Sequence, residues 1–170
     1  MKRVFAFALI FVAAAVSFAA PPALASGEPS ATLQSFGRYD TRRTGQVDKG
    51  ERTATGELRS VDLHRLVEQT DQIVGILDNS FGVVIRLRDF PPGPATLTIR
   101  TIHPPLTNPK TGKTMTVSEY DWPVMIRDNV YFGYTFDHAW EIAEGTWTKQ
   151  ILYNGRVIAE KTFKVVVPLN

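Results

Sequence analysis

The residues of this chain that most resemble a reactive group lie between positions 137 and 141. His138 follows Asp137, and Trp140 and Glu141 come shortly after it. On a helix, His138 and Glu141 would share a face and could ligate a metal. The alternating residues before them favour a strand instead, on which neighbouring side chains point to opposite faces. We therefore expect His138 to be packed and hydrogen-bonded. Ligand binding is the second interpretation, and no metal site is predicted.

Hydrolytic chemistry is the weakest of the hypotheses that the sequence allows. It would require Asp137, His138 and Glu141 to converge around a cleft, and a serine enzyme also needs a nucleophile held against its base. The chain has no G-x-S-x-G segment. It has no Cys, which excludes thiol nucleophiles, thiolate metal sites and disulfides. We predict no catalytic residue and no cofactor.

Aromatic residues are numerous, and they suggest either a packed core or a platform on which a ligand stacks. Most should belong to the core. Trp122 and Tyr131 are the best candidates for exposure, because Trp122 precedes a proline and Tyr131 opposes the apolar face of its strand. The speculative binding set is Trp122, Tyr131, Asp137, His138 and Trp140. Carbohydrate is the ligand class that such a set favours.

The first 25 residues have the layout of a secretory signal peptide. Lys2 and Arg3 precede an uncharged run from Val4 to Ala20, and Ala23-Leu24-Ala25 supplies small residues for cleavage. We predict cleavage after Ala25 and a periplasmic or secreted product without a membrane span. Without Lys2 and Arg3, 17 basic and 17 acidic residues remain. This neutral balance argues against nucleic acid as a partner.

The first third of the exported part gives weak signals. Residues 26–34 are small and polar and should form a flexible lead, and 35–39 is a candidate strand. Residues 40–57 are rich in charge and glycine and predict a long polar loop, more plausibly mobile than functional. Residues 58–77 fit neither the helical nor the strand period cleanly; two short strands, 58–67 and 73–77, are preferred over a helix at 61–69.

From Phe81 onward the strand signal is clear. Residues 83–87 and 95–101 alternate, and His103-Pro104-Pro105 should end the second of these strands. Val130, Phe132, Tyr134 and Phe136 give the next strand an apolar face. Asn154-Gly155 then predicts a type I′ hairpin between 146–153 and 156–167.

A simple two-residue turn would place Lys149 opposite Glu160 and Ile151 opposite Ile158. That register leaves apolar residues on both faces of the hairpin. A bulge or a covering loop must resolve this conflict. Seven to eight short strands without βαβ alternation predict an all-β, immunoglobulin-like two-sheet sandwich, a single domain over residues 35–170.

Several short motifs form a pattern that is specific as a set. They are Asn108-Pro109, Thr111-Gly112-Lys113, Gly133-Tyr134-Thr135-Phe136-Asp137-His138, Trp140-Glu141, Gly145-Thr146-Trp147, Asn154-Gly155-Arg156 and Ala159-Glu160. With them, the chain resembles a bacterial exported family catalogued only as a domain of unknown function. The likeness covers roughly residues 35–167, and Lys149 departs from it by standing where a bulky apolar residue is expected. The resemblance implies one all-β domain and no assigned activity.

Two binding hypotheses therefore precede the hydrolase. The leading one is a non-catalytic exported module that binds another protein or an envelope component. The alternative is a small-ligand module, with carbohydrate as the ligand. The ligand, the partner and the oligomeric state are not encoded in any motif that we recognise.

Overall fold

The computed structural model describes residues 27–125 and 129–169, so the predicted signal peptide lies outside the described residues. Within them the chain forms nine strands and one short 3₁₀ helix, η1. Their bounds are β1 Ser30–Gly50, β2 Gly56–Glu68, β3 Gln72–Val74, β4 Ser80–Arg88, β5 Pro94–Thr107, β6 Thr114–Met125, β7 Asn129–Thr135, η1 Ala139–Glu141, β8 Gly145–Tyr153 and β9 Arg156–Val166. No helix in these two ranges is long and apolar enough to cross a membrane.

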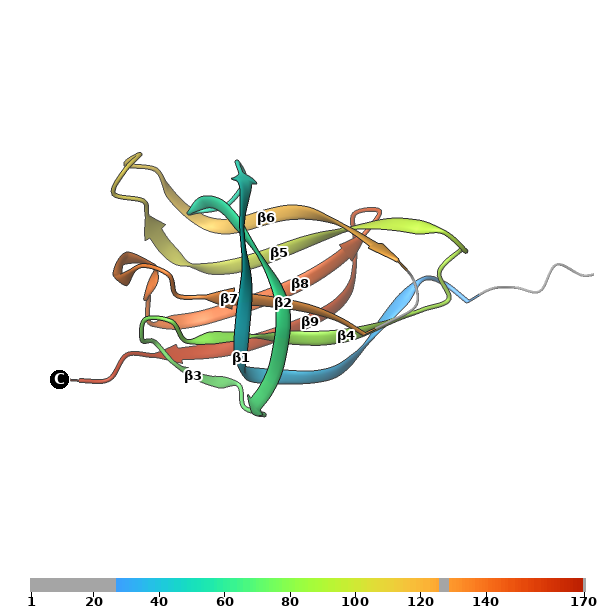
Figure 1. Ribbon diagram of the computed structural model, residues 1–170, viewed down its shortest axis with the longest axis horizontal. Coiled ribbons are helices and arrows are strands. Elements are labelled where there is room, and N and C mark those ends of the chain that lie inside the picture. Colours follow the sequence, from blue (N-terminus) through green and yellow to red (C-terminus); the bar gives the residue numbers. More distant parts are fainter. Residues whose placement is uncertain (1–26, 126–128, 170) are drawn as a thin grey trace, which may run out of the picture.

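Two sheets face each other and confirm the all-β sandwich (Figure 1). The four-stranded sheet has the order β2-β1-β4-β7, and the five-stranded sheet has the order β3-β9-β8-β5-β6. Every pairing is antiparallel except that of β3 with β9. β7 and β6 are edge strands of their respective sheets. The space between these two edges is where the architecture leaves room for a site.

The C-terminal hairpin contains the predicted turn and a bulge, which is one of the two alternatives that the sequence left open. Asn154 and Gly155 both have positive φ, at 49° and 78°, as a type I′ turn requires. The pairing shifts between Ile151 and Leu152, so that Gln150 and not Lys149 lies opposite Glu160. The predicted pairs of Lys149 with Glu160 and of Ile151 with Ile158 were therefore wrong. The bulge changes the phase of β9, so that Phe163 and Val165 share the buried face with Trp147 and Ile151 of β8.

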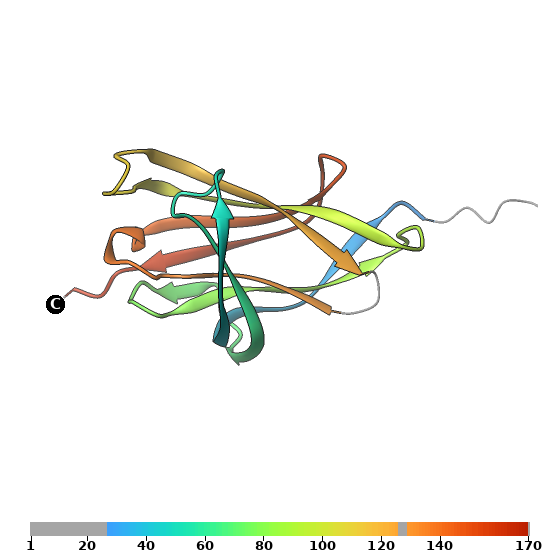
Figure 2. The same cartoon turned by 45° about the horizontal axis from the view of Figure 1, so that its top comes forward.

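Residues 40–57 are not the polar loop that the sequence predicted. They form the second half of β1, a short turn and the start of β2, a long hairpin that crosses the face of the molecule (Figures 1 and 2). Its charged residues pair across the two strands, as Arg42 does with Asp62 and Arg65 with Asp40, both at 3.0 Å. A hairpin exposed along much of its length lacks the apolar alternation by which strands are recognised.

Two further boundaries differ from prediction. β1 begins at Ser30, which pairs with Arg88 of β4, so most of the expected flexible lead belongs to the sheet. β5 continues through Pro104 and Pro105 to Thr107, with a register shift against β6 between Ile102 and Leu106. Prolines are tolerated at such irregular positions. The preference for two strands within 58–77 is confirmed by β2 and β3.

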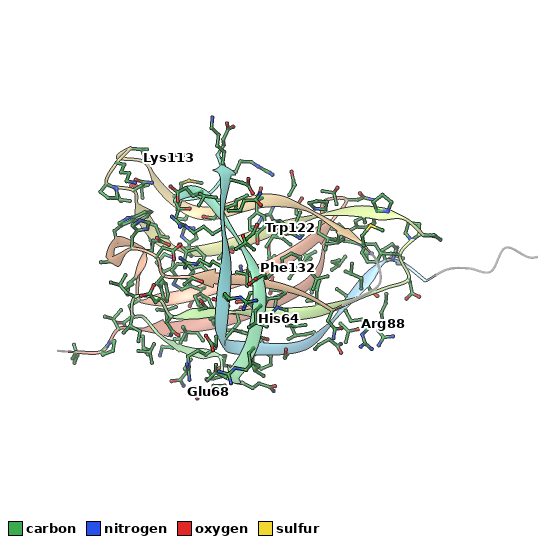
Figure 3. All side chains as sticks on the ribbon, in the orientation of Figure 1. His64, Glu68, Arg88, Lys113, Trp122 and Phe132 are labelled. Carbon is green, nitrogen blue, oxygen red and sulfur yellow. The ribbon has the colours of Figure 1, made fainter. Side chains whose placement is uncertain are left out.

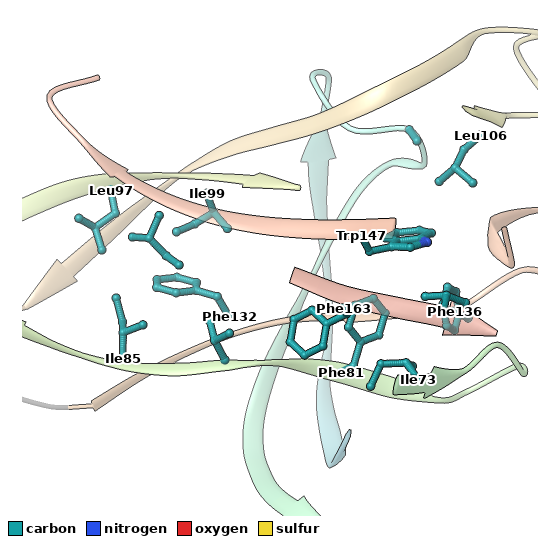
Figure 4. Packing of buried hydrophobic residues seen from close by; sticks show 14 of the residues in the cluster. Ile73, Phe81, Ile85, Leu97, Ile99, Leu106, Phe132, Phe136, Trp147 and Phe163 are labelled. Atoms are coloured by element: carbon teal, nitrogen blue, oxygen red, sulfur yellow. The ribbon is translucent and has the colours of Figure 1, made fainter. Parts of the chain in front are cut away.

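The core lies between the sheets and is rich in aromatic residues (Figure 4). Trp147 is fully buried and meets Phe81 and Phe136 edge-on, with ring centroids 5.8 and 5.6 Å apart. Phe163 packs on Phe81 at 5.2 Å. Such edge-to-face contacts stabilise aromatic pairs beyond the effect of burial alone. This cluster holds the end of the sandwich that carries η1.

Candidate functional site

A cavity of about 390 Å³ opens between the edge strands β6 and β7, under the β1–β2 hairpin. Its walls come from β1, β2, β5, β6, β7, β8 and the segment that leads into η1. His64, Trp122 and Phe132 lie around the place where the hairpin crosses the sandwich (Figure 3), and all three line the cavity. Its volume is within the range of small-molecule sites, roughly 300–1,000 Å³.

Lys149 lies at the buried end of this cavity. Its side chain is 1% exposed, and Nζ donates to Thr101 Oγ1 at 3.0 Å and to the Gly133 backbone oxygen at 3.3 Å. Both acceptors are neutral. Burial lowers the pKa of Lys149 to about 8, because an ammonium group is poorly solvated away from water. The sheet alternation that directs Trp147 and Ile151 inward also directs this lysine inward.

A buried carboxylate, Glu141, joins two other lining residues. Its Oε2 accepts a hydrogen bond from the Tyr134 hydroxyl at 2.6 Å, and its Oε1 lies 2.7 Å from His138 Nδ1. The pairing with His138 arises because η1 follows directly after it, which places residues three apart side by side. Burial raises the pKa of Glu141, and these two hydrogen bonds oppose that effect.

Asp137 has different partners from its neighbour His138. It forms ion pairs with Arg43 of β1 and, at 3.3 Å, with Arg59 of β2. Arg59 also pairs with Glu57 at 2.7 Å. The two arginines belong to the hairpin, so these contacts fasten the hairpin to the segment after β7. Asp137 and His138 diverge as expected for adjacent residues of an extended chain.

Aromatic rings line the part of the cavity nearest the hairpin. Tyr131 stacks on His64 with ring centroids 4.7 Å apart and planes inclined by 9°. The Tyr131 side chain also lies over its own strand. A Cβ atom added to Gly133 would be only 2.0 Å from the Tyr131 hydroxyl. Gly133 thus makes room for the ring. On β6, Tyr120 and Trp122 meet edge-on at 6.3 Å.

The tip of the hairpin is anchored to the opposite sheet by a buried polar network. The Ala54 amide donates to Ser118 Oγ at 3.0 Å, and Ser118 lies 3.0 Å from Nε2 of the buried His103. The Asn108 amide donates to the Ala54 carbonyl at 3.2 Å. Burial lowers the pKa of His103, which favours a neutral ring that accepts at Nε2 and donates from Nδ1 to the Pro104 carbonyl. The hairpin is a fixed cover for the cavity.

Four of the five predicted binding residues line one cavity: Trp122, Tyr131, Asp137 and His138. Trp140 is not in the lining, but it stacks on His138 with ring centroids 5.7 Å apart. Trp122 is 36% exposed, whereas Tyr131 is only partly exposed because the hairpin covers it. His138 does not continue the strand as expected, because β7 ends at Thr135.

Sequence reasoning missed Lys149, Arg43 and Arg59. Arg43 lies in residues 40–57, which were predicted as a loop, whereas Arg59 lies in residues 58–67, for which a strand was preferred and no site residue was proposed. Lys149 carried a signal, since it alternates with Trp147 and Ile151 on a strand whose inward direction was in question. A charged residue between two core residues indicates either that the predicted strand register is wrong or that the residue belongs to a buried polar site.

The lining can bind and orient a ligand, but its reactive groups are already occupied. Asp137, His138 and Glu141 share the cavity, yet each carboxylate has its own partners. Ser118 beside His103 resembles a nucleophile with its base, but Ser118 accepts the Ala54 amide and His103 is held by a backbone carbonyl instead of a carboxylate. The described part of the chain has no group of three metal-ligating side chains.

Comparisons with known proteins agree on fold and family. An immunoglobulin-like protein from Pseudomonas aeruginosa, of known crystal structure, aligns with a TM-score of 0.61 and 19% identity, over 84% of this chain and 99% of its own. At that identity the likeness shows the fold alone. No curated protein matches the chain. A family model for a domain of unknown function, DUF3859, matches residues 28–165. That span is most of the sandwich, so the chain belongs to the DUF3859 family.

Proposed function

We propose that this chain is an exported binding module that holds a small ligand in the cavity under the β1–β2 hairpin. The observation that carries the proposal is the convergence of aromatic and charged side chains from both sheets on one cavity of about 390 Å³. Ligand sites in proteins combine apolar walls with a few oriented polar groups in this way. Carbohydrate remains the favoured ligand class, because aromatic faces stack on sugar rings while charged and hydroxyl groups bind their oxygens.

Thermal unfolding of the purified protein with a panel of envelope sugars tests this function. A ligand at about 100 times its dissociation constant stabilises the folded state by about 2.7 kcal/mol. In a domain of this size that raises the melting temperature by roughly 5–10 °C. Trp122→Ala and Tyr131→Ala should remove most of the shift, because both rings line the cavity.

Met125→Ala is the matched control, since Met125 lies on the same strand as Trp122 and is 64% exposed. It should retain the full shift. A shift that survives both Trp122→Ala and Tyr131→Ala would place the ligand elsewhere, and a panel without any shift would reject a sugar-binding cavity.

Export is part of the proposal and rests on the sequence alone. Its test is N-terminal sequencing of the protein recovered from the cell envelope or the medium. The mature chain should begin at Ser26. Recovery of the intact chain beginning at Met1 would contradict cleavage at this position.

A protein partner, the leading hypothesis from the sequence, has one structural feature in its favour. β2 is an edge strand, and Leu63, Leu66 and Val67 on it are 52%, 37% and 43% exposed. Edge strands can accept a strand from a partner. If β2 binds a partner, Leu63→Lys should abolish the complex, and Val157→Lys, at a residue of β9 that is 41% exposed, should leave it intact. Retention of the complex in both variants would reject β2 as its site.

A further inference from the structure

Lys149 differs from the two arginines of the cavity lining, Arg43 and Arg59, in having no acidic partner among the described residues. Asp137 pairs with both arginines, Glu57 pairs with Arg59, and Asp62 pairs with Arg42. Glu141 contacts the Tyr134 hydroxyl and His138 Nδ1. Those contacts account for every other charged lining residue. Lys149 has only Thr101 and the Gly133 carbonyl as acceptors within the described residues.

A buried ammonium group with neutral partners alone is unfavourable. Charged groups inside proteins are normally paired, because neutral acceptors replace only part of the hydration that is lost on burial. Lysine carries three N–H donors, and two of them are used. Lys149 lines the cavity, so its third N–H can donate to a ligand bound there. A negative charge on a bound ligand would complete the pairing that the protein itself leaves open.

The surrounding charges limit how negative the ligand group can be. Asp137 and Glu141 line the same cavity, and their carboxylates would repel a doubly charged group such as a phosphate monoester. Arg43 and Arg59 are already engaged by Asp137. One unpaired ammonium therefore matches one singly charged group, and a carboxylate is the common group of that kind.

The remaining walls suit a polar ring better than an apolar acid. Tyr131 and Trp122 offer aromatic faces, while the Tyr134 hydroxyl, His138 and Thr135 offer polar atoms within the same lining. The Tyr134 hydroxyl donates to Glu141, and His138 contacts Glu141 through Nδ1. The lone pairs of that hydroxyl and Nε2 of His138 can still bind the hydroxyl groups of a ligand, which a fatty or aromatic acid lacks. A sugar that carries a carboxylate matches both the aromatic and the polar parts of the wall.

We propose that the ligand is an acidic sugar of the uronic-acid class, whose carboxylate binds the Lys149 ammonium group at the buried end of the cavity. This inference rests on the proposed small-ligand function and specifies its chemistry. The sugar ring then lies against Trp122 and Tyr131, toward the hairpin.

The first experiment needs no protein variant. Binding of glucuronate, glucuronamide and glucose to the purified protein is measured by isothermal titration calorimetry. Glucuronamide keeps the ring and replaces the charged group with a neutral amide. We expect glucuronate to bind roughly 10- to 100-fold more tightly than the other two, as for the loss of a charged hydrogen bond. Equal affinities would overturn the role of Lys149 but leave a sugar-binding cavity standing. No binding by any of the three would overturn the acidic-sugar proposal, and the wider sugar panel would then decide the small-ligand function separately.

The second experiment uses Lys149→Met, which keeps an unbranched side chain of similar length and removes the charge. Lys164→Met is its control, because Lys164 is exposed on the neighbouring strand β9. We expect the first variant to bind glucuronate and glucuronamide equally and the control to keep the wild-type preference. A preference for glucuronate that persists in a folded Lys149→Met protein would assign the carboxylate to another residue.

Discussion

Two regions of the same sandwich, the aromatic cluster around Trp147 and the cavity around Lys149, are built from the same strand. Trp147 and Lys149 are two residues apart on β8, and both point inward and are almost fully buried. Around Trp147 the two sheets close tightly with Phe81 and Phe136. Around Lys149 the edge strands β6 and β7 stand apart, and the hairpin covers the space between them. Burial alone therefore does not distinguish a core position from a site; the residue type placed there does.

The two regions also differ in the interactions that hold them together. The aromatic cluster is stabilised by dispersion and by the removal of apolar surface from water, which are additive over many contacts. The cavity is closed by directed contacts, chiefly the ion pairs of Asp137 and the hydrogen bonds of Ser118 and Asn108. Loss of one directed contact should therefore loosen the hairpin locally, whereas loss of one core ring should weaken the whole fold.

The largest effect is expected from Trp147→Ala. Removal of a buried tryptophan leaves a cavity in the core and should lower the free energy of unfolding by about 3–5 kcal/mol. Trp122→Ala, at a partly exposed ring on the cavity wall, should lower it by less than about 1 kcal/mol. Denaturant unfolding of both variants measures the difference. Similar losses would mean that the two regions do not differ in packing.

A smaller effect is expected from the pH dependence of Lys149. The pKa of Lys149 is about 8 in the folded state, against 10.5 for an ordinary lysine. Below pH 8 Lys149 is protonated in both the folded and the unfolded protein, and the folded protein is destabilised by the full cost of burying the charge. Between pH 8 and pH 10.5 the unfolded state holds a proton that the folded state has lost, so stability rises with pH.

The stability of the wild type relative to Lys149→Met should thus increase by about 2 kcal/mol from pH 7 to pH 9.5. Taking the difference removes the contributions of neighbouring groups that titrate in both proteins, among them Tyr134 and Glu141. His103 is coupled to Lys149, but burial lowers the pKa of His103 and keeps its ring neutral over this pH range. Denaturant unfolding across this pH range provides the measurement. A difference that stays flat with pH would show that the lysine is solvated in the folded state.

The most local effect is expected from Asn108→Ala, which removes the hydrogen bonds from the β5–β6 turn to the carbonyls of Ala54 and Thr55. We expect a loss of about 1–3 kcal/mol, since those buried carbonyls lose their donor. Hydrogen exchange should accelerate at the hairpin tip and remain unchanged around Trp147. Thr111→Ala, at an exposed residue of the same turn, is the control and should change neither. Faster hydrogen exchange throughout both sheets would show that the hydrogen bonds of Asn108 stabilise the whole fold and not the hairpin tip alone.

The site residues on β6, on β7 and in the segment before η1 could be predicted from the sequence. Trp122, Tyr131, Asp137 and His138 stood out by residue type and by their place in an alternating strand, and all four line the cavity. The site residues that the β1–β2 hairpin contributes could not be predicted. Arg43 lies in the segment predicted as a loop, and Arg59 lies in the following segment, which fits neither period cleanly. Their shared partner, Asp137, is distant from both in sequence. Local patterns carry no information on which distant charge will neutralise which.

What the sequence determined by itself is the all-β sandwich, the type I′ turn at Asn154-Gly155 and the conflict in the last hairpin that a bulge or a covering loop had to resolve. Strand alternation and turn chemistry are local properties, which is why these features could be predicted. The tertiary structure alone decided where the bulge lies, that the β1–β2 hairpin crosses the sandwich, and that Lys149 faces a cavity instead of a packed core. Those outcomes depend on how two sheets diverge at their edges and on which segment covers the gap. They are set by contacts between residues far apart in the chain, and the sequence pattern around each residue does not specify them.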